Sequence, residues 1–260
     1  MSQSVRRVAV VGEDDALPDA VGGLDALRGV VESAGGRLAR ESVGGATDAS
    51  GTADAVVAVG ESAVIETALE TATDDDPTPV LPVGVGRHTV PGTAAPDAVR
   101  QLLAGEAKTV EHPVVSVTVD GDDFGRALLD VALVTDEPAR ISEYGVGFPT
   151  GRKMSIRADG IVVATPLGSD GYAGAAGGSV LEPATGLSVV PVSPFTTGAE
   201  TWVVSGSVTL SVERDEEPVS FVVDGERAGA VPANEPIRIG VSEHVPLLSV
   251  PACPADRDGG

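Results

Sequence analysis

The first hundred or so residues alternate between short β-branched runs and segments with helical spacing. The runs predict buried strands at Val8–Val11, Asp54–Gly60 and Pro79–Val85. Apolar residues three or four positions apart predict helices at Leu24–Ala34, Ala63–Thr71 and Ala98–Leu103. We expect Ser62 to cap the second helix. This alternation predicts a parallel sheet with right-handed crossovers, which is an α/β, Rossmann-like domain.

The pattern changes near residue 108. The chain then alternates with period two or forms short valine-rich runs that turn residues separate, which predicts a mostly antiparallel β domain. The runs are Val114–Val119, Ala127–Val134, Gly160–Thr165, Trp202–Val212 and Phe221–Val223. We therefore expect an α/β domain over residues 1–107, a β domain over 108–251 and a frayed tail over 252–260. Trp202 and Phe221 are expected to lie in the core.

Composition narrows the class of protein. Hydrophobic residues make up 42% and charged residues 22% of the 260 residues, which is typical of a globular chain. The net charge of −22 argues against a nucleic acid as partner, because phosphate contacts need clustered Lys and Arg. So acidic a chain, with two lysines and 3% aromatic residues, favours a protein that works in concentrated salt, where like charges are screened. The alternative is an ordinary acidic protein from a GC-rich genome.

The chain shows no sign of secretion or of a membrane anchor. No apolar run approaches the roughly 18 residues that a membrane span needs, and the run after Arg7 is too short for a signal sequence. The single cysteine, Cys253, cannot form an internal disulfide. We therefore expect a cytoplasmic protein with no membrane partner.

The densest candidate for chemistry is the segment 157–182. A strand at Ile161–Ala164 runs into Thr165-Pro166, and small residues follow as far as Gly178. Small residues let backbone N–H groups approach a ligand, and a helix beginning there would add positive dipole character. The alternative is a glycine-rich turn packed against a sheet. Tyr172 stands alone among these residues, where it would stack on a base, donate a hydrogen bond or lie in the core.

Residues 159–178 resemble the signature of the NAD kinase family, roughly D-G-[LI]-[IV]-V-[SA]-T-P-T-G-S-T-A-Y-x-x-S-A-G-G-P. The matching residues are Asp159, Gly160, Ile161, Val163, Ala164, Thr165, Pro166, Gly168, Ser169, Tyr172, Ala176, Gly177 and Gly178. Shorter flanking motifs also resemble those of the family, in the same order. They are Ala127–Val131 for A-L-N-[DE]-V, Pro138–Arg140 for P-[AR]-[RM], Pro191–Pro194 for T-P-I-C-P and Asp224–Glu226 for D-G-Q.

The resemblance implies an α/β nucleotide-binding domain and a β-sandwich-like domain with the active site between them. It implies transfer of the γ-phosphoryl group of ATP to the 2′-hydroxyl of the adenosine ribose of NAD, with Mg²⁺ or another divalent cation, in a homo-oligomer. The positions that it assigns to nucleotide binding are Gly60, Asp130, Asp159, Thr165, Asp170, Gly171, Tyr172 and Ala175.

The chain departs from the family at the G-G-D-G-T motif, where residues 60–64 read Gly-Glu-Ser-Ala-Val. Ser62 stands at the position of the Asp that accepts the 2′-hydroxyl proton, and a hydroxyl is a poor base at neutral pH. Glu61 places a negative charge where ATP phosphates would lie, at a cost of about 1–4 kcal/mol. Glu61 is either a substitute base or a solvated acid at a helix start. Leu129 also replaces the Asn of the family.

Three hypotheses follow from these departures. The chain is an active NAD kinase, a non-catalytic NAD(P)- or nucleotide-binding relative that serves as a regulator or partner subunit, or a structural relative that has lost the pocket. No dedicated metal site is expected. The pair Asp14-Asp15 follows a strand, but paired acids are common in so acidic a chain, and His88, His112 and His244 lack metal-ligand spacing.

Overall fold

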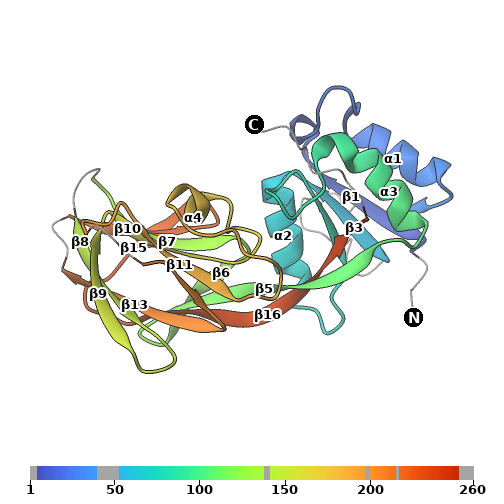
Figure 1. Cartoon of the computed structure of the whole chain (residues 1–260). Helices are drawn as coiled ribbons and strands as arrows, with labels where there is room; N and C mark the ends of the chain where they lie inside the picture. The colour runs from blue at the N-terminus through green and yellow to red at the C-terminus, as the bar shows by residue number, and fades with distance from the viewer. Residues whose placement is uncertain (1–4, 40–52, 138–140, 197–199, 215–216, 252–260) are drawn as a thin grey trace. The chain divides into compact units, whose positions relative to one another are not determined.

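The computed structural model describes residues 5–39, 53–137, 141–196, 200–214 and 217–251. Pro138–Arg140 and the expected tail with Cys253 lie outside the described residues. The chain divides into two compact units (Figure 1). The first combines the residues up to His112 with those from Val245 onward, and the second spans Pro113–His244.

The first unit is a parallel sheet covered by helices. Its strands run in the order β2-β1-β3-β4 and are β1 (Arg7–Gly12), β2 (Arg37–Leu38), β3 (Ala55–Val59) and β4 (Val80–Val83). Its helices are α1 (Gly23–Ser33), α2 (Glu61–Thr71) and α3 (Ala95–Leu103), with single 3-10 turns at Asp14–Ala16 and Gly92–Ala94. Buried side chains of α1 and α3, such as Leu27 and Leu102, pack on Val57 and its neighbours. The predicted α/β architecture is thus confirmed.

The turn from β3 into α2 differs from the sequence expectation. Helix α2 begins at Glu61, and its N-cap is Gly60, which has φ +90° and makes no side-chain cap hydrogen bond. The predicted cap at Ser62 is therefore wrong, because Ser62 is already inside the first turn. Glycine is favoured here since a Cβ at residue 60 would lie 2.9 Å from Ala16 Cβ and φ is positive.

The second unit is a sandwich of two mainly antiparallel sheets. One sheet contains β5 (Lys108–Val119), β6 (Asp122–Ala127), β8 (Ser142–Gly147), β9 (Lys153–Ala158), β13 (Ser207–Arg214) and β16 (Ile237–Ser249). The other contains β7 (Asp130–Thr135), β10 (Gly160–Ala164), β11 (Leu187–Val192), β12 (Trp202–Val204), β14 (Val219–Val223) and β15 (Glu226–Ala230). Tyr144 and Leu210 of the first sheet share one core with Leu133 and Phe221 of the second. The antiparallel β domain is therefore confirmed, and Trp202 packs at the edge of this core.

Two boundaries differ from those that the pattern predicts. The run Trp202–Val212 forms two strands in different sheets, β12 and β13, because the chain crosses the sandwich between them. The expected division after residue 107 and the single domain over 108–251 also differ from the compact units. Strand β16 pairs with β13 in its first half, but Leu247 near its end pairs in parallel with Val80 of β4. One continuous strand pattern does not reveal that the two ends of β16 pair with strands of different units.

The helices among the described residues are too short or too polar to cross a membrane.

A carboxylate at the start of β3 fastens the first strand of the parallel sheet. Asp54 accepts hydrogen bonds from the backbone N–H groups of Arg6 and Arg7, at 2.9 and 2.8 Å, and lies 3.7 Å from the Arg7 guanidinium. The hydrogen bond from the Arg7 backbone is the largest of the contacts that lower the pKa of Asp54. The stabilisation that Asp54 provides is therefore complete above the pKa that its carboxyl group has in the unfolded chain. It is lost as the pH falls through the lower pKa that this group has in the folded protein.

We predict that Asp54→Asn flattens the acid side of the stability profile. Because the variant lacks this titration, its free energy of unfolding should fall less steeply than that of the wild type below about pH 4. Urea denaturation between neutral and acidic pH measures both slopes. Asp74→Asn changes an exposed carboxylate instead and should keep the wild-type slope. An unchanged slope in Asp54→Asn would contradict the role of this carboxylate.

Candidate functional site

The bend after β10 is anchored by Thr165, which is fully buried. Its backbone N–H donates to the carbonyl of Leu129 at 2.8 Å. Its hydroxyl lies 2.7 Å from the Leu128 carbonyl and 3.0 Å from that of Leu129, so that its one proton is shared between them. The bend is thereby fixed to the corner between β6 and β7, which leads directly into Asp130.

The small residues of the bend are needed for packing. A Cβ on Gly168 would lie 2.3 Å from the Leu129 carbonyl oxygen, and one on Gly178 would lie 2.8 Å from that of Ala173. Ser169 is buried, donates to the Pro166 carbonyl and accepts the Leu181 N–H, both at 2.8 Å. Further along, several backbone N–H groups donate hydrogen bonds to carbonyl groups of the bend itself and so do not face a ligand. They belong to Gly171, Ala175, Ala176, Gly177 and Gly178. At these five positions the glycine-rich sequence therefore forms a packed turn, which is one of the two alternatives that the sequence left open.

A second set of hydrogen bonds, made by Asp224, holds the corner that leads into Asp130. The Asp224 carboxylate accepts the N–H groups of Leu128, Leu129 and Asp130 at 2.8, 2.7 and 3.0 Å. The Asp224 N–H donates in return to the Asp130 carbonyl at 2.9 Å. Asp224 has φ +47° in the tight turn between β14 and β15, where it precedes Gly225. The sequence marked Asp224 only as a motif match, although Asp-Gly between two apolar runs is a hairpin signal.

The structure brings Asp130, Asp159 and Tyr172 together. Asp130 begins β7 and is 8% exposed, whereas Asp159 directly precedes β10 and is half-buried. Tyr172 begins the short helix α4 (Tyr172–Ala175) and is 40% exposed, so it is not a core residue. Burial, followed by the negative charges of Asp130 and Asp159, raises the pKa of Tyr172 above its ordinary value. The result is a neutral phenol with an accessible ring beside two acidic residues.

The other predicted site residues fall into two sets. Asp170, Gly171 and Ala175 belong to the same bend as Tyr172, with Gly171 and Ala175 exposed and Asp170 half-buried. Gly60, Glu61 and Ser62 belong to the first unit, where they follow the carboxyl end of β3. Glu61 and Ser62 are both exposed in the first turn of α2. Among the described residues, no base is hydrogen-bonded to the Ser62 hydroxyl, so nothing there would activate it.

No protein metal centre is formed by the described part of the chain. It contains no group of three or more His, Cys, Asp or Glu residues that could hold an ion. Asp14, which the sequence offered as a possible ligand, instead accepts the Leu24 N–H at 2.7 Å at the beginning of α1.

We predict that Gly168→Ala destabilises the second unit by about 1–3 kcal/mol, because the added methyl group forces the bend away from the Leu129 carbonyl. Gly206→Ala is the matched control. Residue 206 has no atom within 4 Å of a built Cβ, so its stability should change little. Chemical denaturation of both variants measures the difference. Equal stability of the two variants would show that the contact at Gly168 relaxes freely.

The fold defines the class of protein first. The structure of yeast NADH kinase complexed with NADH matches with a TM-score of 0.70 at 14% identity and covers 96% of this chain and 84% of that chain. The structure of the Archaeoglobus fulgidus NAD kinase in complex with ATP matches with a TM-score of 0.67 at 22% identity, over 94% and 93% of the two chains. The chain thus has the fold of the NAD(H) kinases, an α/β unit with an antiparallel β unit.

Sequence comparison shows which proteins the chain is similar to. The family model of the ATP-NAD kinase C-terminal domain matches residues 128–249, which include the Thr165 bend, Asp130 and Asp224. NAD kinase of Methanopyrus kandleri is 32% identical over 154 residues, 57% of this chain and 56% of that protein. NAD kinase of Methanosarcina acetivorans is 28% identical over 176 residues, 65% of this chain and 64% of that protein. The matches span less than two thirds of these relatives. Residues 128–249 thus match the C-terminal domain of the ATP-NAD kinases, and the chain as a whole is similar to NAD kinases.

Proposed function

We propose that the protein transfers the γ-phosphoryl group of ATP to the 2′-hydroxyl of NAD, and that it does so slowly. The observation that carries this proposal is the grouping of Asp130, Asp159 and Tyr172 beside the Thr165 bend, within the segment that matches the family's C-terminal domain. The related proteins are named NAD kinases, and solved structures of the same fold hold NADH or ATP. These likenesses support nucleotides as the ligands.

The chemistry of the cluster suits a dinucleotide. The Tyr172 ring is accessible and borders two carboxylates, so its face can stack on a base while the acids lie near its hydroxyl. A carboxylate accepts hydrogen bonds and donates none when ionised, which matches the hydroxyl groups of a ribose. We therefore assign the ring of Tyr172 to stacking and the carboxylate of Asp130 to ribose hydroxyls.

The reaction joins O2′ of the ribose to the γ-phosphorus and breaks the bond from that phosphorus to the bridging oxygen, so that ADP leaves. The proton of the 2′-hydroxyl must go to a base or to water. Positioning and charge stabilisation supply most of the catalysis in phosphoryl transfer, so the reaction does not depend wholly on a strong base. A missing general base costs about 10²–10⁴-fold in rate. Ser62, in place of Asp, is the reason that we propose a slow enzyme.

The divalent cation fits the proposal as a part of the substrate. Since the described residues form no group of three ligands, the cation would enter with the phosphates of ATP. The exposed Glu61 carboxylate at the start of α2 opposes those phosphates if they lie at this helix, which would weaken ATP binding.

The second candidate function is NAD(P) binding without catalysis. Ser62 and Glu61 favour it, because both differ from the family motif at the position of the reacting groups. A regulator or partner subunit would keep the Tyr172 cluster and need no base.

We predict that Ser62→Asp raises the rate of NADP formation by about 10²–10⁴-fold, since it restores a base at the second residue of α2. An acid in the first helical turn is also favourable for the helix. Glu61→Gly is added in a double variant to lower the KM for ATP. Val64 is left unchanged because it is fully buried, and a threonine there would bury a hydroxyl.

The assay incubates ATP, NAD and Mg²⁺ in concentrated KCl and measures NADP. Ser62→Asn is the matched control, because it has nearly the shape of Asp and no basic carboxylate, and it should remain as slow as the wild type. Absence of NADP from both the wild type and Ser62→Asp, in protein that is folded and binds NAD, would replace the kinase by the second candidate.

We predict that Tyr172→Ala weakens NAD binding, whereas Tyr172→Phe keeps most of it, because stacking needs the ring alone. Thermal shift measures this, since a ligand at 100 times its Kd stabilises a protein by about 2.7 kcal/mol. Val203→Ala removes another exposed apolar side chain of the same unit and is the control. Unchanged affinity in Tyr172→Ala would remove Tyr172 from the site, and with it the assignment of this cluster to nucleotide binding.

A further inference from the structure

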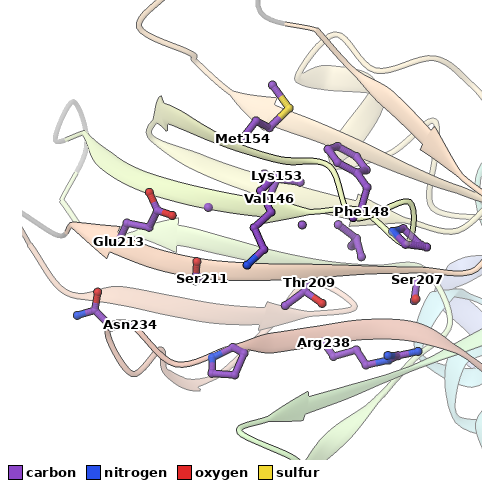
Figure 2. Close-up of a pocket in the computed structure, with 16 residues that line it drawn as sticks. Val146, Phe148, Lys153, Met154, Ser207, Thr209, Ser211, Glu213, Asn234 and Arg238 are labelled. Carbon is purple, nitrogen blue, oxygen red and sulfur yellow. The ribbon is translucent and has the colours of Figure 1, made fainter.

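A polar trough lies on the outer face of the sheet formed by β8, β9, β13 and β16, and none of its lining residues is among those assigned above. Its volume is about 650 Å³, which is within the usual range for small-molecule sites. Figure 2 shows the hydroxyl side chains Ser207, Thr209 and Ser211 in line along β13, with Glu213 at the end of the line. All of the lining residues belong to the second unit.

Two cations border the trough. Lys153 pairs with Gly147 in the sheet, Gly147 with Thr209, and Thr209 with Arg238, so these residues form one row across four strands. Three strand spacings separate the two cationic residues by about 14 Å along this row. Figure 2 shows the Lys153 side chain directed from β9 across β8 toward β13. Two positive charges can therefore reach the space above one row of the sheet.

These cations have no competing partner within the described part of the chain. Neither the Lys153 nor the Arg238 side chain makes an ion pair or hydrogen bond there, whereas Arg126, Arg152 and Arg227 of the same unit lie within 4 Å of a carboxylate. The chain has 39 acidic and 17 basic residues, so these two cations are a local exception to its overall negative charge. They supply a local positive charge in an acidic protein.

The space between the cations is kept open by Gly147. A Cβ there would lie 3.6 Å from Thr209 Cβ, in ordinary contact, and the residue does not have a positive φ. The fold therefore accepts a side chain at residue 147. Gly145 is different, because a Cβ there would lie 2.4 Å from Ser211 Oγ and 2.6 Å from Glu213 Oε1. The open floor at Gly147 thus has no explanation in packing.

We propose that this trough binds a sugar monophosphate. The phosphate lies above Gly147 between Lys153 and Arg238, where both cations make charge-assisted hydrogen bonds to it. The sugar hydroxyls lie along β13, and Glu213 accepts hydrogen bonds from them at the far end. Because Glu213 is the one carboxylate among the 16 lining residues, it repels a second phosphate at that end and selects a ligand with a single charged group.

The chain carries a reporter for this site. Trp202 is its single tryptophan, and the ring of Phe148, which lines the trough, lies edge-on to it with 5.7 Å between ring centroids. Titration of the full chain with glucose 6-phosphate, inorganic phosphate and glucose, at one fixed and modest KCl concentration, is followed by tryptophan fluorescence. We expect saturable binding of glucose 6-phosphate, weaker binding of phosphate, no binding of glucose, and weaker glucose 6-phosphate binding as KCl rises.

Four variants test the assignment. Lys153→Gln and Arg238→Gln should each raise the Kd for glucose 6-phosphate about tenfold or more, because each removes a hydrogen bond from a charged group. Gly147→Leu should abolish binding by filling the floor. Lys108→Gln changes the one other lysine, which does not line the trough, and should leave the Kd within about twofold.

Circular dichroism shows that each variant is folded, and Gly147→Ala replaces Gly147→Leu if the larger side chain prevents folding. The proposal is overturned if glucose 6-phosphate gives no saturable change at millimolar concentrations, or if Lys108→Gln weakens it as much as Lys153→Gln. It is also overturned if inorganic phosphate binds as tightly as glucose 6-phosphate, since the hydroxyl row would then have no role. None of these titrations uses a nucleotide, so their outcome is independent of the proposed kinase function.

Discussion

The second unit depends on how one short corner, Leu128 to Asp130, is held. Its three N–H groups bind a single carboxylate, that of Asp224, and two of its carbonyls receive Thr165. Buried backbone groups must be satisfied, and a corner between strands has no ladder partner to satisfy them. A turn 95 residues away and a bend 36 residues away therefore supply the missing partners. The same corner places Asp130 beside Tyr172, so one set of hydrogen bonds supports both the fold and the candidate site.

This dependence explains how a chain keeps a family's fold while its reacting residues change. Thr165, Gly168 and Asp224 cannot be replaced without loss of a hydrogen bond or a steric clash. Glu61 and Ser62 lie exposed on the first turn of α2, where a change of side chain disturbs little packing. The positions that fold the second unit and the motif positions that differ at the start of α2 are therefore different residues. The family motif can degenerate at the second set with little cost to stability.

The charge of the chain bears on function through the basic side chains that have no acidic partner among the described residues. The net charge is −22, and several basic side chains of the second unit have nearby acids as partners, such as Glu243 for Arg126 and Asp136 for Arg227. Lys153 and Arg238 are left to face a polar trough, so an anion would find its strongest local attraction there. In the first unit, by contrast, Glu61 adds a negative charge at a helix start. Local arrangement, and not the total charge, decides where an anionic ligand is favoured.

The pattern of residues along the chain was enough to predict the classes of structure and the resemblance to NAD kinases. Period-two runs and helical spacing located β1, β3, α1 and the antiparallel second half, because burial on one face imposes that periodicity. The motif at 159–178 located the bend and Tyr172. Only the tertiary structure decided that the glycines of the bend serve packing, that Asp224 binds three amides of a distant corner, and that Gly147 opens a row between two cations. Each of these depends on which strands lie side by side, and strand pairing joins residues whose separation in the chain leaves no local signal.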